Sequence, residues 1–160
     1  MKIRYFARPL PALMVGNALV NPGALLDDGK LWESWVPSGG CPTALVLDEA
    51  WRDLQMLLGE NGQDPPRPAF ELVRGAATYA NGEICPYNRV LDPLQVCAIA
   101  GDLAGTDLHE LYQHCLPLHS PDWATIMDGR RGYVEHYLGA AAAFSNSVAS
   151  EGMGMVYSIR

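Results

Sequence analysis

The sequence has few lysines, no signal peptide and no long hydrophobic run. Only Lys2 and Lys30 occur among its 160 residues, beside nine arginines. The first eight residues lack the apolar segment of a signal peptide. The nearest candidate for a membrane helix, 138–150, is rich in Ala and Ser and falls short of the roughly 18 residues that a span needs. We therefore expect a cytoplasmic protein with no membrane partner.

Motifs of the common nucleotide-binding and hydrolytic sites are also missing. The sequence holds no G-x-x-x-x-G-K-[ST] loop, no G-x-G-x-x-G turn and no G-x-S-x-G elbow. Its four cysteines include no C-x-x-C pair, which argues against a zinc ribbon or a thioredoxin-like site. Cys41 precedes a predicted helix, but no partner base is identified, so an ordinary thiol is expected there. The sequence predicts no catalytic residue, no metal and no cofactor.

What is present fits one folded domain. Hydrophobic residues make up 49% of the chain and charged residues 18%, which is the balance of a soluble globular protein. A chain of this length can bury a core of its own. No internal repeat or linker divides it, so we expect a single domain over residues 1–160.

Charge is unevenly distributed along the chain. Residues 44–128 hold thirteen acidic and four basic residues, a balance of −9, whereas 1–43 and 129–160 each carry +1. An acidic surface repels phosphate backbones and attracts basic protein surfaces. The sequence therefore predicts no nucleic-acid partner and favours a basic protein partner. Ordinary solvated helix faces are the alternative interpretation.

Strands are predicted at both ends of the chain. Residues 2–6 alternate between polar and apolar side chains, and 153–159 alternate between large and small ones. Pro9 and Pro11 are expected to end the first strand. Because single strands are unstable in a largely helical chain, we expect the two to pair. The predicted fold class is α+β: a single compact domain, mostly helical, with a small sheet that includes the N-terminal and C-terminal strands.

Helical spacing accounts for much of the rest. A short helix is expected after Pro11, and the strongest amphipathic pattern starts at about residue 44 or 47, ends at 58 and has Thr43 as its cap. Further helices are expected over 108–115, 123–127 and 132–150.

One more helix is expected to begin at Asp92, with Pro93 in its first turn. Its inward face is predicted to hold Leu94, Cys97/Ala98 and Ala100/Gly101. Glycines and prolines in 75–88 argue against a long element in that segment.

The densest cluster of titratable residues consists of His109, Glu110, His114, Cys115 and His119. Pairs four residues apart on an unbroken helix could share a metal ion. A proline inside the segment breaks that geometry. We therefore expect capping or surface roles for these histidines.

Aromatic residues and one arginine are the candidates for ligand binding. They are Trp51, Tyr87, Arg89, Trp32 and Trp35. Arg89 could clamp a carboxylate or a phosphate, because a guanidinium donates two parallel hydrogen bonds to such groups. The alternative is a structural bond from Arg89 to the carboxylate of Asp92 or to carbonyls at a helix end.

The segment LDEAWRDLQMLLG, residues 47–59, resembles a helix that is typical of the YfbM-like family of small bacterial proteins, L-D-K-A-W-x-x-L-x-x-L-L-T/S-G. Residues 87–96, the end segment 133–157 and the opening 1–6 resemble further parts of the same family. Glu49 stands where the family has lysine, so a basic group that served a ligand at this position would be missing. The resemblance implies an α+β domain with no established reaction and no known cofactor.

Three functions follow as hypotheses. The first is a non-enzymatic interaction domain, accessory or immunity-like, whose acidic face binds a basic protein. The second is a small-molecule-binding or hydrolytic enzyme with a pocket near Trp51, Tyr87 and Arg89. The third is an obligate homodimer formed through the apolar stripe of Ala141, Ala142 and Phe144. The sequence leaves the choice between monomer and homodimer open.

Overall fold

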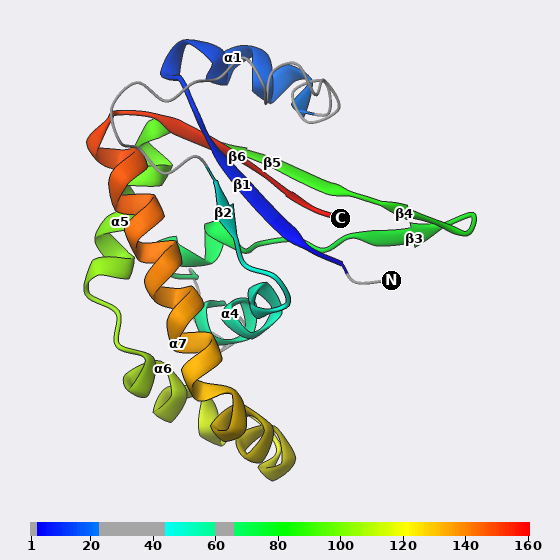
Figure 1. Cartoon of the computed structure of the whole chain (residues 1–160), viewed down its shortest axis with the longest axis vertical. Coiled ribbons are helices and arrows are strands. Elements are labelled where there is room, and N and C mark those ends of the chain that lie inside the picture. The colour runs from blue at the N-terminus through cyan, green and yellow to red at the C-terminus, as the bar shows by residue number, and fades with distance from the viewer. Residues whose placement is uncertain (1–2, 23–43, 60–65) are drawn as a thin grey trace.

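The two ends of the chain lie side by side in one antiparallel sheet (Figure 1). A computed structural model describes residues 3–22, 44–59 and 66–160. The sheet has the strand order β2-β1-β6-β5. Its strands are β1 (Tyr5–Leu10), β2 (Leu45–Val46), β5 (Tyr87–Leu91) and β6 (Gly154–Ile159). The predicted pairing of the first and last strands is confirmed, and so is the α+β class.

The remaining elements are mostly helical. They are α1 (Ala12–Val20), α4 (Ala50–Leu58), the 3-10 helix η1 (Pro68–Leu72), α5 (Pro93–Ala104), α6 (Leu108–Cys115), the 3-10 helix η2 (Leu116–Leu118) and α7 (Pro121–Ser150). A separate two-stranded hairpin consists of β3 (Thr78–Ala80) and β4 (Glu83–Cys85).

The sheet separates two apolar clusters of unequal size. The larger one fills the space between the sheet and the helices α4 to α7, and the smaller one lies under α1 on the opposite face (Figure 1). Val15 and Ala18 of α1 contact Val90 and Val156 of the sheet in the smaller cluster. The hairpin β3–β4 extends from β5 away from both layers (Figure 1).

Pro9 does not end the first strand, contrary to expectation. The backbone groups of Arg4 and Arg160 exchange two hydrogen bonds, so every second residue from Arg4 onward bonds to β6. Pro9 is one of the alternate residues that do not bond to β6, and its backbone nitrogen faces the β2 side. The described pairing of β1 with β2 ends at Ala7. The missing N–H of Pro9 therefore removes no hydrogen bond between described residues of the sheet, and the strand continues to Leu10.

The predicted helix over 44–58 begins later than expected. Leu45 and Val46 form β2, and the helix starts only at Ala50. Asp48 has a φ of 47°, a left-handed conformation that a right-handed helix cannot include. Thr43, the expected cap, lies outside the described residues.

The inward face of α5 differs from the predicted one. Leu94 is 82% exposed and Cys97 is exposed. Ala100 of the predicted face is buried as expected, and the buried stripe consists of Val96, Ile99, Ala100 and Leu103. These four aliphatic residues recur at helical spacing and meet α7, so their burial sets the rotation of the helix. The predicted start is confirmed, because Asp92 caps α5 and Pro93 is its first residue.

One helix of 30 residues replaces the two that were predicted after residue 120. Gly129 and Gly132 each weaken a helix by about 1 kcal/mol relative to alanine. Burial of Met127 and Val134 on either side of them opposes that loss, and Ser120 caps the start. The predicted stripe through Val148 and the stop at Glu151 are confirmed.

Candidate functional site

Arg89 and Tyr87 lie on the same face of β5 and share one network with Glu71 of η1. One terminal guanidinium nitrogen of Arg89 donates to a Glu71 carboxylate oxygen, and the other lies 3.3 Å from the Tyr87 hydroxyl. Arg74 pairs with the second oxygen of Glu71 at 2.9 Å. The structural partner of Arg89 is therefore Glu71, whereas the sequence analysis expected Asp92 or carbonyls at a helix end. The carboxylate of Asp92 instead accepts a hydrogen bond from the backbone of α5.

The charge of Arg89 is held by these contacts. Partial burial lowers the pKa of Arg89, but the hydrogen bond to the Tyr87 hydroxyl and the negative charge of Glu71 raise it by more. The pKa of Arg89 therefore lies above its ordinary value. Arg89 is a permanent cation that shares the Glu71 carboxylate with Arg74, so these three side chains together carry one positive charge.

Two stacked tyrosines fix η1 against the sheet. The rings of Tyr5 and Tyr157 lie 5.2 Å apart, and both hydroxyls donate to carbonyls of the η1 segment. Burial is the main reason why the pKa of each tyrosine is raised, so both hydroxyls stay protonated donors. This packing places Glu71 beside Arg89.

Gln55 of α4 holds the chain that follows η1. Its amide nitrogen lies 2.8 Å from the carbonyl oxygens of both Val73 and Gly75. Gly75 has a φ of 101°, and a Cβ there would come within 2.3 Å of the Tyr87 ring. Glycine is thus required for the close approach that seats Tyr87.

An open cavity of about 500 Å³ runs along β5. Leu19, Pro22, Tyr87, Asn88, Arg89, Val90, Asp92 and Gln95 line it. Two buried polar atoms of this lining, Asn88 Oδ1 and Arg89 Nε, have no hydrogen-bond partner among the described residues. One guanidinium nitrogen of Arg89 is paired with Glu71 and another lies beside Tyr87, so both terminal nitrogens have partners within the chain.

Trp51, a further predicted ligand-binding residue, does not join this cavity. Trp51 is 3% exposed in the main core and is absent from the lining. Trp32 and Trp35 lie outside the described residues. Of the five candidates, the structure therefore brings together Tyr87 and Arg89.

The histidine-rich segment is dispersed over different contacts. His109 Nδ1 lies 2.7 Å from Arg131, His119 stacks on Trp123 with ring centroids 4.4 Å apart, and Cys115 is fully buried. Within the described ranges, no group of three or more His, Cys, Asp or Glu residues could hold a metal ion.

Arg67 and Arg130 form internal ion pairs. Arg67 binds Asp102 with two hydrogen bonds of 2.7 and 3.0 Å. Burial opposes ionisation of Asp102, but the bonds from Arg67 and from the Ala69 amide outweigh it, so the pKa of Asp102 is lowered. Arg130 lies 2.8 Å from Asp53. There burial outweighs the ion pair, and the pKa of Asp53 is raised.

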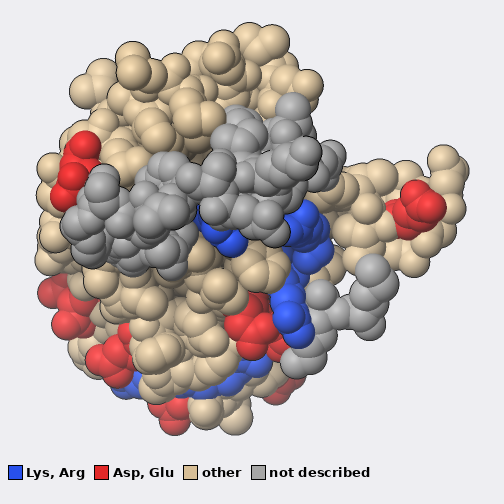
Figure 2. Space-filling view, turned by 45° about the horizontal axis from the view of Figure 1, so that its top comes forward, with Lys and Arg blue, Asp and Glu red and all other residues tan. Residues whose placement is uncertain are grey.

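Acids on α6 and on the first half of α7 remain exposed. Asp107, Glu110, Asp122 and Asp128 are exposed, and the structure shows no ion pair for any of them within its described part. Leu118 and Ile126, 52% and 61% exposed, belong to the same helical end. We call these six residues the acidic end. In Figure 2, acidic side chains are scattered over the lower half of the view, and the top, where α1 lies, is almost free of charge.

No family model, no curated protein and no solved structure matches the chain. Among the helices that the structure describes, none is long and apolar enough to cross a membrane.

Glu71 and Asn88 are the residues of this region that sequence reasoning missed. Glu71 lies 18 residues from Arg89 in the chain. It belongs to a short 3-10 helix that no periodic sequence pattern predicts. Asn88 follows a tyrosine in a segment where no strand was expected. An Asn81-Gly82 pair between short β-prone segments was the available signal for the hairpin.

Proposed function

We propose that the protein is a non-enzymatic interaction domain that binds a basic protein partner through the acidic end. The observation that carries this proposal is that several basic side chains are paired inside the protein while acidic side chains are exposed. Arg67, Arg89 and Arg130 are folded onto internal carboxylates, whereas the acids of the acidic end face solvent. A basic partner therefore meets four exposed carboxylates that form no internal ion pair among the described residues.

The acidic end also offers apolar contacts. Asp122 and Ile126 lie four residues apart on α7, so they are neighbours on one face of the helix. Exposed leucine or isoleucine surrounded by charged residues is the arrangement of a protein interface with an apolar centre and a polar rim. We expect the partner to present lysine or arginine around an apolar side chain.

A lysine-rich peptide with one central leucine tests this proposal. We expect the affinity to fall steeply between low and physiological salt, because exposed charges are screened. The double variant Asp122→Asn/Asp128→Asn should weaken binding by about tenfold, on the basis of roughly 0.5–1 kcal/mol for each exposed charge. The matched control Glu83→Gln/Glu151→Gln removes the same charge elsewhere and should leave affinity within about twofold. Equal effects of the two double variants would contradict a localised site.

The small-molecule alternative has weaker support. Its proposed clamp, Arg89, is already engaged by Glu71, and Trp51 lies in the core. The variant Arg89→Met separates the two roles. We expect it to lower the free energy of unfolding by about 1–3 kcal/mol, since it removes charge-assisted hydrogen bonds. Carboxylates and phosphates should raise the melting temperature of neither protein; a rise confined to the wild type would favour the pocket.

A cytoplasmic location and membership in the YfbM-like family also remain proposals. Exposed thiols at Cys85 and Cys97 support the first, because free surface cysteines are stable in a reducing compartment. The resemblance of residues 47–59 supports the second.

A further inference from the structure

One side of the strand segment from β4 to β5 is left unpaired by the described residues. Arg4 and Arg160 exchange both backbone hydrogen bonds, so Val156 and Ser158 of β6 bond to β1. Tyr157 and the other alternate residues of β6 then bond to β5. Their partners in β5 are Tyr87, Arg89 and Leu91. The N–H and C=O groups of Asn88 and Val90 consequently point away from the sheet.

The hairpin prolongs this unpaired side. Asn81 and Gly82, with φ values of 54° and 83°, form a two-residue turn that makes Ala80 and Glu83 a hydrogen-bonded pair. Glu83 and Cys85 therefore bond to β3, and Ile84 faces the other way. Figure 1 shows β3 on the same side of the β4–β5 segment as β6. The outer edge, which we define as residues 84, 86, 88 and 90, is thus continuous over seven positions, and its only proline is Pro86.

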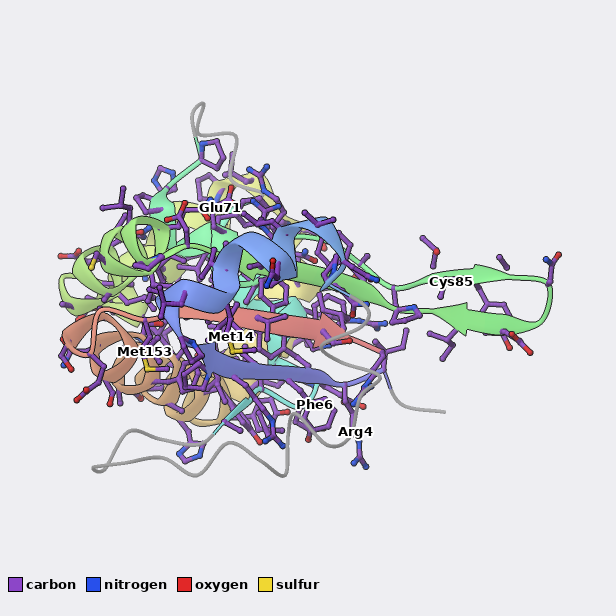
Figure 3. All side chains as sticks on the ribbon, turned by 90° about the horizontal axis from the view of Figure 1, so that it is seen from above. Arg4, Phe6, Met14, Glu71, Cys85 and Met153 are labelled. Carbon is purple, nitrogen blue, oxygen red and sulfur yellow. The ribbon has the colours of Figure 1, made fainter. Side chains whose placement is uncertain are left out.

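The hairpin receives little support from its own chain. Tyr79 is 72% exposed, Cys85 is exposed, and Figure 3 shows Cys85 on an arm away from the body of the molecule. A two-stranded hairpin is marginally stable alone in water. Long unpaired edges are usually covered or protected by charge in monomeric proteins. An added strand along the outer edge would extend the main sheet and stabilise the arm.

The surroundings of the outer edge are apolar and nearly uncharged. Leu19 lines the cavity beside the edge and is 60% exposed, and Leu94, next to the lining residue Gln95, is 82% exposed. Helix α1 contains no charged residue. Near the edge, Arg89 and Arg74 share Glu71, and Asp92 caps α5, so the charges of these four side chains sum to zero. A basic partner would gain nothing from this surface.

A second copy of the same chain matches these properties. Two molecules of net charge −7 repel each other, except where each presents an uncharged surface. An edge strand is complementary to itself when two copies meet antiparallel about a two-fold axis. We propose that the outer edges of two copies pair antiparallel to form a homodimer with one continuous sheet, flanked by Leu19 and Leu94. This interface is independent of the acidic end.

Sedimentation equilibrium over a range of concentrations tests the proposal, with Asn88→Pro as the main variant. Proline at 88 removes an N–H that points outward and no bond between β5 and β6, so the fold is expected to tolerate it. Each dimer loses this bond twice, and we expect the dissociation constant to rise about tenfold or more. The control Asn88→Ala keeps the N–H and should change the constant by less than about threefold.

Two further measurements keep the result decisive if Asn88→Pro fails to fold. Leu94→Glu should abolish dimerisation, whereas Leu118→Glu, at the acidic end, should not. Hydrogen exchange at the Asn88 and Val90 amides should slow as the protein concentration rises, which a dimer through another surface would not produce. A monomer at all concentrations, or a dimer unaffected by Leu94→Glu with fast exchange at both amides, overturns the proposal. Peptide binding at the acidic end is measured separately and does not depend on this outcome.

Discussion

Helices α1 and α4 have the same length, nine residues, and very different surfaces. Helix α4 buries five residues in the core and places Arg52 in solvent. Helix α1 buries only Val15 and Ala18, while Leu13 and Val20 are 97% and 87% exposed. The main apolar face of α4 is buried within the chain, whereas α1 has an outer apolar face that the described residues leave uncovered. Such a face is typical of an interaction surface.

Shortening a leucine on each helix should have the largest effect. Leu54→Ala in α4 leaves a cavity in the main core, and we expect the free energy of unfolding to fall by about 2–5 kcal/mol. Leu13→Ala in α1 removes an exposed side chain and should change it by less than about 0.5 kcal/mol. Urea unfolding of dilute protein measures both. Comparable losses would show that the outer face of α1 is covered within the monomer.

Adding a methyl group to a glycine of each helix sharpens the same contrast. A Cβ at Gly59, which ends α4, would lie 1.9 Å from the Phe70 ring, so Gly59→Ala should destabilise by about 1–3 kcal/mol. A Cβ at Gly16 in α1 meets no atom within 4 Å. Gly16→Ala should therefore stabilise by about 0.5–1 kcal/mol through helix propensity. Thermal unfolding that shifted in the same direction for both variants would disprove this difference in packing.

Polar contacts distinguish the two helices as well. Gln55 of α4 bonds to two carbonyls of the segment after η1, and Gln55→Ala should lower the free energy of unfolding by about 1–2 kcal/mol. Asn17 of α1 is exposed, and Asn17→Ala serves as the control with no expected loss. Hydrogen exchange of the residues around Gly75 should accelerate only in the Gln55 variant. An equal response in both would mean that the two carbonyl bonds contribute little.

Acid–base behaviour gives the smallest expected difference. The pKa of Asp53 in α4 is raised above 3.8 by burial, so the folded state holds its proton more tightly than the unfolded chain. The stability that the protonated Asp53 contributes is fully present below pH 3.8, the pKa in the unfolded chain. It is lost as the pH rises through the higher pKa of the folded state. Asp53→Asn should flatten this part of the stability profile. Helix α1 has no titratable side chain, and Asn17→Ala should leave the profile unchanged.

Patterns that depend on neighbouring residues were predictable from the sequence. The buried face of α4, the capped start of α5 at Asp92 and the presence of a strand at β6 were all predicted from patterns within one element. Pairing of the terminal strands followed from the requirement that a strand has a partner.

Features that depend on distant residues were not predictable. Pro9 is tolerated in β1 because the described pairing with β2 ends at Ala7. The rotation of α5 about its axis is set by packing against α7. The partner of Arg89 is Glu71 because two tyrosines from β1 and β6 hold η1 in place. Sequence reasoning found Tyr87 and Arg89 but could not find Asn88, because its importance lies in the direction of its backbone groups.

The position of β6 between β1 and β5 also determines the order of folding. Tyr5 pairs with Ile159, so the centre of the sheet closes a loop that includes almost the whole chain. Contacts of such long sequence separation form late and slow the overall rate, whereas α5, α6 and α7 can assemble from local contacts. We expect a helical intermediate to precede the sheet. A chain that lost residues 154–159 would leave β1 and β5 without their common neighbour, and aggregation through both strands would be the expected result.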